Sequence, residues 1–232
     1  MCGNYISLSA YLKNKKMNYK ALIPFSGGID STAGLYLTLT QQPEAHFLVF
    51  KINLINGECA SRTVKEEQAV NHILDELRRM GIQNFTFKRL SFDYSQLGPP
   101  PIWDSEAVNF AAATCLRAHP EISELVEGAI ADDYLQEGFQ ERLDQIEKIL
   151  YLVSERSKAD FKIVFPLKNM LKYEVMKNIP PNILKLTWSC RYPEGAANWE
   201  LKRCHKCSTC KTIDQVLEKH PNEFDFLKEN WL

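Results

Sequence analysis

The sequence predicts an α/β fold in which helices cover both faces of a doubly wound parallel sheet. Two observations support this expectation. Apolar segments of strand length alternate with segments of helical periodicity along most of the 232 residues. No internal repeat or low-complexity stretch interrupts the alternation. Strict alternation of strand and helix favours a parallel sheet, whose ligand crevice lies at the carboxyl ends of the strands.

Five segments are expected to form the sheet, because each is a short apolar run bounded by polar or turn-forming residues. They are residues 21–25, 47–54, 85–92, 125–130 and 161–165. Helices are expected over residues 32–39, from a capping-box sequence at Thr63 and Glu66 to Gly81, from about Ser105, and over residues 139–153. The proline-rich stretch 98–101 is expected to form a rim or lid beside the crevice.

Composition indicates one sizeable core with a small appendage, since 45% of the residues are hydrophobic. We expect a main domain over residues 1–185 and a C-terminal segment, 186–232, packed on it. The net charge of −1 and the lack of a long run of Lys or Arg make a nucleic-acid partner unexpected, so a small-molecule substrate is the default. No apolar run is long enough for a membrane span and no secretory signal is recognisable, which favours a cytoplasmic location.

A glycine turn joins the first expected strand to the first expected helix. Its two glycines let the backbone approach a ligand, and the helix N-terminus that follows favours an anion such as phosphate. Side-chain hydroxyl groups add donors at Ser26, Ser31 and Thr32. Residues 26–31 resemble the Ser-Gly-Gly-x-Asp-Ser pyrophosphate loop (PP-loop) of the ATP pyrophosphatases, whose fold is the adenine nucleotide alpha hydrolase type. The loop is not a Walker loop, because the Gly-Lys-Ser/Thr ending is missing.

Four of the seven cysteines crowd into one C-terminal segment, which indicates a metal site in a reducing compartment. They are Cys190, Cys204, Cys207 and Cys210. Two-residue gaps let the last three thiolates converge on one ion, and four soft ligands suit tetrahedral zinc in a structural role. An iron–sulfur cluster uses a comparable run, but the usual Cys-Pro continuation is missing. His205 is an alternative ligand in place of one cysteine.

The chain resembles the QueC family, the 7-cyano-7-deazaguanine synthases. Residues 186–193 together with the three later cysteines are similar to the family's C-terminal zinc signature. Residues 166–167 and 172–175 resemble its Pro-Leu and Lys-x-Glu-Val stretches, and residues 127–134 resemble its fourth strand and acidic turn. These matches run from about residue 20 to residue 211 in the family's order.

The resemblance implies an enzyme that uses ATP and Mg²⁺ on 7-carboxy-7-deazaguanine and carries Zn²⁺. The carboxylate is adenylated, ammonia displaces AMP to give an amide, and a second ATP converts the amide to the nitrile. The phosphate-binding residues implied are Phe25, Ser26, Gly27, Gly28, Asp30, Ser31 and Thr32, with Asp30 also placed to hold magnesium. Lys168 and Lys172 are implied to stabilise charge during catalysis, and Asp133 to receive a guanine-like N–H edge.

Three segments depart from the family pattern on the substrate side, at residues 53–59, 102–106 and 133–142, and the spacer between Cys190 and Cys204 is longer. A diverged member, of the kind found in phages or antiviral defence, would join the activated acid to a protein or other amine. A tRNA thiolase on the same loop is less favoured, because Cys59 and Cys115 form no reactive pair. A non-catalytic nucleotide sensor and a homodimeric assembly also stay open.

Overall fold

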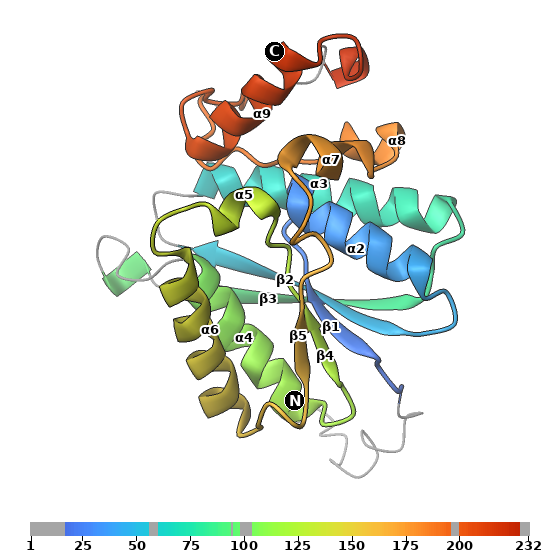
Figure 1. Cartoon of the computed structure of the whole chain (residues 1–232), viewed down its shortest axis with the longest axis vertical. Coiled ribbons are helices and arrows are strands. Elements are labelled where there is room, and N and C mark those ends of the chain that lie inside the picture. The colour runs from blue at the N-terminus through green and yellow to red at the C-terminus, as the bar shows by residue number, and fades with distance from the viewer. Residues whose placement is uncertain (1–16, 56–59, 94, 98–103, 196–199, 228–232) are drawn as a thin grey trace, which may run out of the picture.

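The computed structural model describes residues 17–55, 60–93, 95–97, 104–195 and 200–227. Five parallel strands form one sheet in the order β3-β2-β1-β4-β5 (Figure 1). The strands are β1 Ala21–Pro24, β2 Phe47–Ile55, β3 Phe85–Asp93, β4 Glu124–Val126 and β5 Lys162–Val164. The predicted parallel sheet is therefore confirmed, and each of the five strands overlaps its expected segment.

The helices follow the strands in the alternation that the sequence predicts. They are α2 Ile29–Gln41, α3 Ala60–Arg79, α4 Asp104–Ala118, α5 Ala131–Tyr134, α6 Phe139–Ser154, α7 Lys172–Lys177, α8 Pro181–Leu184 and α9 Ser208–Lys219, with short 3-10 helices at Ser95–Leu97 and Asp225–Leu227. The expected capping box is wrong, because α3 begins at Ala60 and Thr63 lies inside its first turn. The Thr63 hydroxyl instead donates to the carbonyl oxygen of Leu54 at 3.3 Å.

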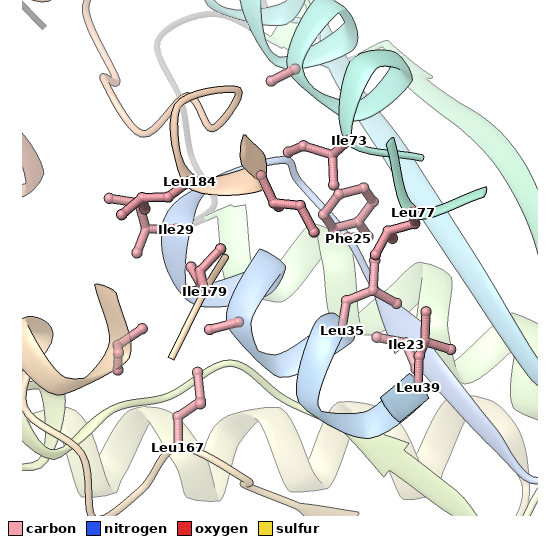
Figure 2. Close-up of a cluster of buried hydrophobic side chains, with 14 of the residues drawn as sticks. Ile23, Phe25, Ile29, Leu35, Leu39, Ile73, Leu77, Leu167, Ile179 and Leu184 are labelled. Carbon is pink, nitrogen blue, oxygen red and sulfur yellow. The ribbon is translucent and has the colours of Figure 1, made fainter. Parts of the chain in front are cut away.

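Two buried layers lie on the two faces of the sheet. On one face, α2 and α3 pack on β1 and β2 together with the segments around Leu167, Ile179 and Leu184. Figure 2 shows Ile179 and Leu184 near Ile29. On the other face lie α4 and α6 (Figure 1). The first layer continues into α9 through Ile213, so the C-terminal segment shares this core. The division into domains at residue 185 is a prediction that the packing alone does not decide.

Strand order sets the position of the crevice. The chain moves from β1 outward to β2 and β3, and then crosses back to place β4 on the other side of β1. Ligands of doubly wound sheets bind at such a switch point, beyond the carboxyl ends of the strands. The turn after β1 and the segment after β4 both lie there. In the described part of the chain, every helix is too short or too polar to span a bilayer.

Candidate active site and metal centre

The turn after β1 requires glycine at its second position. Gly27 has a φ of +79°, in the left-handed region that L-residues with side chains rarely adopt. A Cβ atom placed on Gly27 would lie 3.1 Å from the Cβ of Ala69 and 3.1 Å from the backbone N of Val70. Both the conformation and the close contact with α3 therefore select glycine, as the sequence predicts for a ligand-binding turn.

Hydroxyl groups converge above this turn. The Oγ atoms of Ser26 and Ser31 lie 2.9 Å apart, and Ser31 Oγ donates to the carbonyl oxygen of Gly28 at 3.1 Å. The amide of Gly28 donates to Ser26 Oγ at 3.3 Å. Thr32 is buried, and its Oγ1 has no hydrogen-bond partner among the described residues. Together with the N-terminus of the 13-residue helix α2, these groups form a cradle of donors for an anion.

The segment just before Cys190 supports the loop from behind. The amide of Trp188 donates to the carbonyl oxygen of Gly27 at 2.9 Å. The amide of Ile29 donates to Ser189 Oγ at 3.0 Å, across 160 positions of sequence. Trp188 also donates from its indole Nε1 to the carbonyl oxygen of Cys190 at 3.1 Å. The loop and the cysteine segment are thus joined directly, a relationship that no spacing in the sequence reveals.

Asp30 and Lys172 are brought together. Lys172 Nζ lies 2.5 Å from Oδ1 and 2.6 Å from Oδ2 of Asp30, and the Lys172 side chain is only 7% exposed. The amide of Lys172 donates to Oδ2 of Asp132 at 2.7 Å, which fixes the start of α7 against the acidic turn. Lys168 has an exposed side chain and does not line the crevice, so it lies apart from the other residues of the predicted set.

Asp133 lies in the crevice and also has a structural contact. Its Oδ2 accepts a hydrogen bond from the amide of Ile130 at 3.0 Å, as a side chain does in the first turn of a helix. Burial raises the pKa of its carboxyl group above the ordinary value. Its other oxygen, Oδ1, accepts a longer hydrogen bond from Gln136 Nε2 at 3.4 Å, so the substrate role predicted for Asp133 remains a prediction.

A cavity of about 580 Å³ opens beside the loop. Ser26 and Ser31 belong to its wall, so the cavity and the phosphate cradle share residues. Apolar side chains from β2, α4, α6 and the β5 end form the remaining wall, including Phe50, Ile52, Val108, Leu143, Ile146, Ile163 and Phe165. Its volume lies within the range of about 300–1,000 Å³ that is usual for small-molecule sites.

Sequence reasoning missed a partly buried charge network along this cavity. Lys51 Nζ lies 2.5 Å from Glu66 Oε2, Arg62 Nε lies 2.7 Å from Glu66 Oε1, and Arg62 Nη1 lies 2.6 Å from Asp104 Oδ2. Lys51 lies within an interior strand and its side chain is only 3% exposed, although it is charged. Burial disfavours the charge of Arg62, but the two carboxylates outweigh it and raise the pKa of its guanidinium. A lysine within a largely apolar strand was the available signal.

Only some residues of the segments that depart from the family pattern lie in the cavity wall. Asp104 and, from the third segment, Tyr134, Gln140 and Arg142 line the cavity. Asn53 instead donates to Glu67 Oε1 at 2.7 Å. Cys59, Trp103 and the proline-rich stretch 98–101 lie outside the described residues.

The four predicted metal ligands converge. The Sγ atoms of Cys190, Cys204, Cys207 and Cys210 all lie within 4.8 Å of one another, and all four residues are buried. Burial opposes ionisation of Cys204, but the amides of Lys206 and Cys207 donate to its Sγ at 3.5 and 3.3 Å and lower its pKa to about 6. Four clustered sulfurs with amide donors suit one tetrahedral zinc ion with no open position.

Two charged or polar side chains, His205 and Arg203, lie next to the metal centre without belonging to the sulfur cluster. His205, the alternative ligand, lies outside the sulfur cluster and contacts Asp214, with 3.0 Å between Nδ1 and Oδ2. Arg203 lies over the ring of Trp188 at 4.7 Å and donates to the carbonyl oxygen of Thr187 at 3.0 Å. Its guanidinium therefore places a positive charge between the cysteine cluster and the segment that supports the loop.

Comparisons with known proteins agree with this architecture. The structure resembles the U34-tRNA thiolase NcsA from Methanococcus maripaludis with its [4Fe-4S] cluster, with a TM-score of 0.50 and 17% sequence identity over 93% of this chain and 71% of that one. At this identity the likeness concerns the fold alone. The family model described as "Queuosine biosynthesis protein QueC" matches residues 20–220, from β1 through the cysteine cluster to the end of α9. The chain therefore belongs to the QueC family.

Proposed function

We propose that this protein is an ATP-dependent carbon–nitrogen ligase that activates the carboxylate of a 7-deazaguanine acid. The observation that carries the proposal is the shared wall of the loop and the cavity. Ser26 and Ser31 belong to both, so the phosphates of ATP and an acid in the cavity would meet at these hydroxyls. Membership of the QueC family supports 7-carboxy-7-deazaguanine as that acid, and a cytoplasmic location as its setting.

The chemistry follows from the poor reactivity of carboxylates. A carboxylate oxygen of the substrate attacks the α-phosphorus of ATP, and the bond to pyrophosphate breaks. The resulting acyl adenylate is attacked at carbon by ammonia, which expels AMP and leaves an amide. A second ATP activates the amide oxygen in the same way, with release of pyrophosphate, and loss of AMP and of both amide protons gives the nitrile.

The loop residues have distinct tasks in this scheme. The backbone from Phe25 to Gly28 and the hydroxyls of Ser26, Ser31 and Thr32 would hold the pyrophosphate as it departs. Lys172 supplies a buried positive charge at the same point. Magnesium, when bound, neutralises phosphate charge, and Asp30 is the loop carboxylate that would hold it by giving up part of its contact with Lys172.

Two further roles belong to the same proposal. Lys168 would contribute positive charge from outside the cavity wall, since its side chain is exposed and does not line the cavity. The four cysteines would bind a structural zinc ion that holds the segment behind the loop.

The test is turnover by the purified protein. It would be supplied with ATP, magnesium and 7-carboxy-7-deazaguanine, with ammonium added or withheld, and AMP and the deazaguanine products would be followed by chromatography and mass spectrometry. Ammonia-dependent amide or nitrile supports the proposal. Absence of AMP release with this acid would reject it and favour a nucleotide sensor.

A second candidate keeps the adenylation and changes the acceptor. The segments that differ from the family pattern contribute Asp104, Tyr134 and Arg142 to the cavity wall, where they would alter what enters after activation. In this case the activated acid would pass to an amine of a protein, as in an antiviral role. A mass increase on a protein acceptor in the absence of ammonium would support it, and an ammonia-dependent nitrile would exclude it.

A further inference from the structure

Two hydrogen-bond acceptors in the cavity wall lack partners. Oε1 of Glu127 and Oδ1 of Asn109 are shielded from solvent, and neither has a hydrogen-bond partner among the described residues. Both residues line the cavity beside the loop. Buried acceptors without donors are rare in folded proteins, because each loses its hydrogen bonds to water without replacement. Their presence in one cavity therefore points to a ligand that supplies donors.

The orientation of Asn109 is fixed by its other amide atom. Nδ2 donates to the carbonyl oxygen of Ser105 at 2.9 Å within α4, and the residue is only 2% exposed. Turning the amide over would place two oxygens against each other, so the nitrogen stays on the helix side. Oδ1 is then the amide atom that lacks a partner, in a residue that lines the cavity.

Glu127 is held at the point where β4 leaves the sheet. Its amide donates to the carbonyl oxygen of Val164 at 2.9 Å, which continues the pairing with β5 by one residue. The next residue, Gly128, packs on the loop so closely that a Cβ there would lie 3.4 Å from the backbone N of Ser31. The Glu127 side chain thus extends from a fixed backbone next to the phosphate cradle.

Within the described residues, no neighbouring charge offsets the burial of the Glu127 carboxyl group. Among the cations of the cavity wall, Lys51 and Arg62 are paired with Glu66 and Asp104 at 2.5–2.7 Å, and Arg191 Nη1 lies 3.9 Å from Asp104 Oδ2. Burial without a compensating partner raises the pKa of the Glu127 carboxyl group to about 7. A ligand with N–H donors would replace the missing partners and favour the carboxylate.

We propose that Glu127 and Asn109 are specificity-determining residues that accept hydrogen bonds from N–H groups of a planar, amino-substituted nitrogen heterocycle. The inference rests on the proposed function and deepens it, since it names the residues that would select the acid. An amino group beside a ring N–H presents two parallel donors, which match the two oxygens of a carboxylate. The apolar walls at Phe50, Ile146 and Phe165 would enclose the ring.

Other occupants fit the cavity less well. A purely apolar ring would leave both acceptors unpaired, and an organic phosphate or a second carboxylate would bring more acceptors to Glu127. The sites for anionic groups lie at the loop instead. Glu127 and Asn109 would therefore recognise the arrangement of hydrogen-bond donors on the ligand and not its size.

The test compares two acids that differ by one donor group. Isothermal titration of the full chain would use 7-carboxy-7-deazaguanine and the analogue that lacks the exocyclic amino group. The wild type is expected to bind the amino compound about 10- to 100-fold more tightly, because the analogue leaves buried acceptors unpaired. Glu127→Gln and Asn109→Ala should each reduce this preference by about tenfold.

Glu147→Gln is the matched control. Glu147 lines the same cavity, but its carboxylate already lies 2.6 Å from Lys158 Nζ, so the preference should be unchanged. Thermal unfolding and zinc content would confirm that each variant is folded. If Asn109→Ala fails to fold, the nearly isosteric Glu127→Gln decides the matter alone.

The outcomes separate this inference from the proposed function. A wild type without preference, or an unchanged preference in Glu127→Gln, overturns the inference, whereas AMP release with the acid would still support the ligase. Preferential binding that Glu127→Gln abolishes, without AMP release, supports the inference and rejects the ligase. If neither acid binds the wild type, both are rejected.

Discussion

Asp30 and Lys172 form a two-pronged ion pair across 142 positions of sequence, with Lys172 Nζ at 2.5 and 2.6 Å from the two carboxylate oxygens. The pair joins the first turn of α2 to the first residue of α7. Since Lys172 is buried and Asp30 is one-third exposed, the carboxylate is the partner that an incoming cation or phosphate would reach first. Displacement of Asp30 toward magnesium would then release Lys172 toward the phosphates.

Asp30→Asn should reduce AMP formation by at least about 100-fold. The change removes the charge of the loop carboxylate and leaves the buried Lys172 ammonium group without its negatively charged partner. AMP release by chromatography at saturating ATP measures the effect. Asp75→Asn is the control, since Asp75 forms an exposed pair with Arg78 at 2.9 Å on the outside of α3. Normal AMP release by Asp30→Asn would remove the ion pair from the mechanism.

Gly27→Ala should destabilise the protein more than Gly81→Ala. Both glycines have positive φ, at +79° and +83°, so both variants carry similar backbone strain. Only Gly27 has atoms at 3.1 Å from the added Cβ, whereas Gly81 has none within 4 Å. We expect Tm to fall by about 2–4 °C for Gly81→Ala and by roughly twice that for Gly27→Ala. Equal shifts in scanning calorimetry would contradict the packing argument.

Ser189→Ala should weaken ATP binding without loss of metal. The change removes the acceptor for the amide of Ile29, which costs about 1 kcal/mol and loosens the loop. We expect KM for ATP to rise several-fold at unchanged zinc content. Ser157→Ala, which removes the hydroxyl contact with Asp160 at 2.8 Å in a remote turn, should leave KM unchanged. An equal KM in the two variants would show that the segment behind the loop does not support nucleotide binding.

Cys207→Ser should abolish stoichiometric zinc binding, because three thiolates and a hydroxyl form a poorer tetrahedral site. Elemental analysis is expected to give about one zinc per wild-type chain, and Tm of the variant should be lower by roughly 10 °C or more. Cys115→Ser, whose sulfur lies outside the cluster, is the control. Full zinc content in Cys207→Ser would refute the assignment of the ligand set.

The stability of the ligand-free protein should depend on Glu127 and pH. Its folded pKa of about 7 exceeds the ordinary 4.5, so the folded state binds the proton more tightly. Stability from this group is therefore greatest below pH 4.5 and falls as pH rises to about 7. The Tm of wild type relative to Glu127→Gln should fall over that window and stay level above it. The other charged residues of the cavity wall, present in both proteins, are Lys51, Arg62, Glu66, Asp104, Asp133, Arg142, Glu147 and Arg191.

The sequence was sufficient for the sheet, the phosphate loop and the metal ligands, since each has a local signature. Apolar periodicity located the five strands, and the two-residue cysteine gaps located most of the sulfur cluster. The strand predicted to reach residue 130 ends at Val126, one residue before the last hydrogen bond to β5 at Glu127, and Gly128 then packs against the loop. An apolar run cannot show where a strand leaves the sheet.

Contacts between distant segments were beyond sequence reasoning. Lys172 could be proposed by resemblance, but its pairing with Asp30 depends on how α7 packs on α2. The network of Lys51, Glu66 and Arg62 has no motif, since a charged residue inside a strand becomes meaningful only once its partner is known. The same holds for the unpaired acceptors of Glu127 and Asn109, which are defined by what the surroundings lack.

The hydrogen bond from Trp188 to Gly27 has a consequence for engineering this chain. A shortened version that stops at residue 185 would keep every strand and the whole glycine turn, yet lose two of the bonds that hold that turn in place. Grafting a new substrate cavity onto this scaffold should therefore transfer the β1 turn and the cysteine segment as one inseparable unit, even though more than 150 residues lie between them.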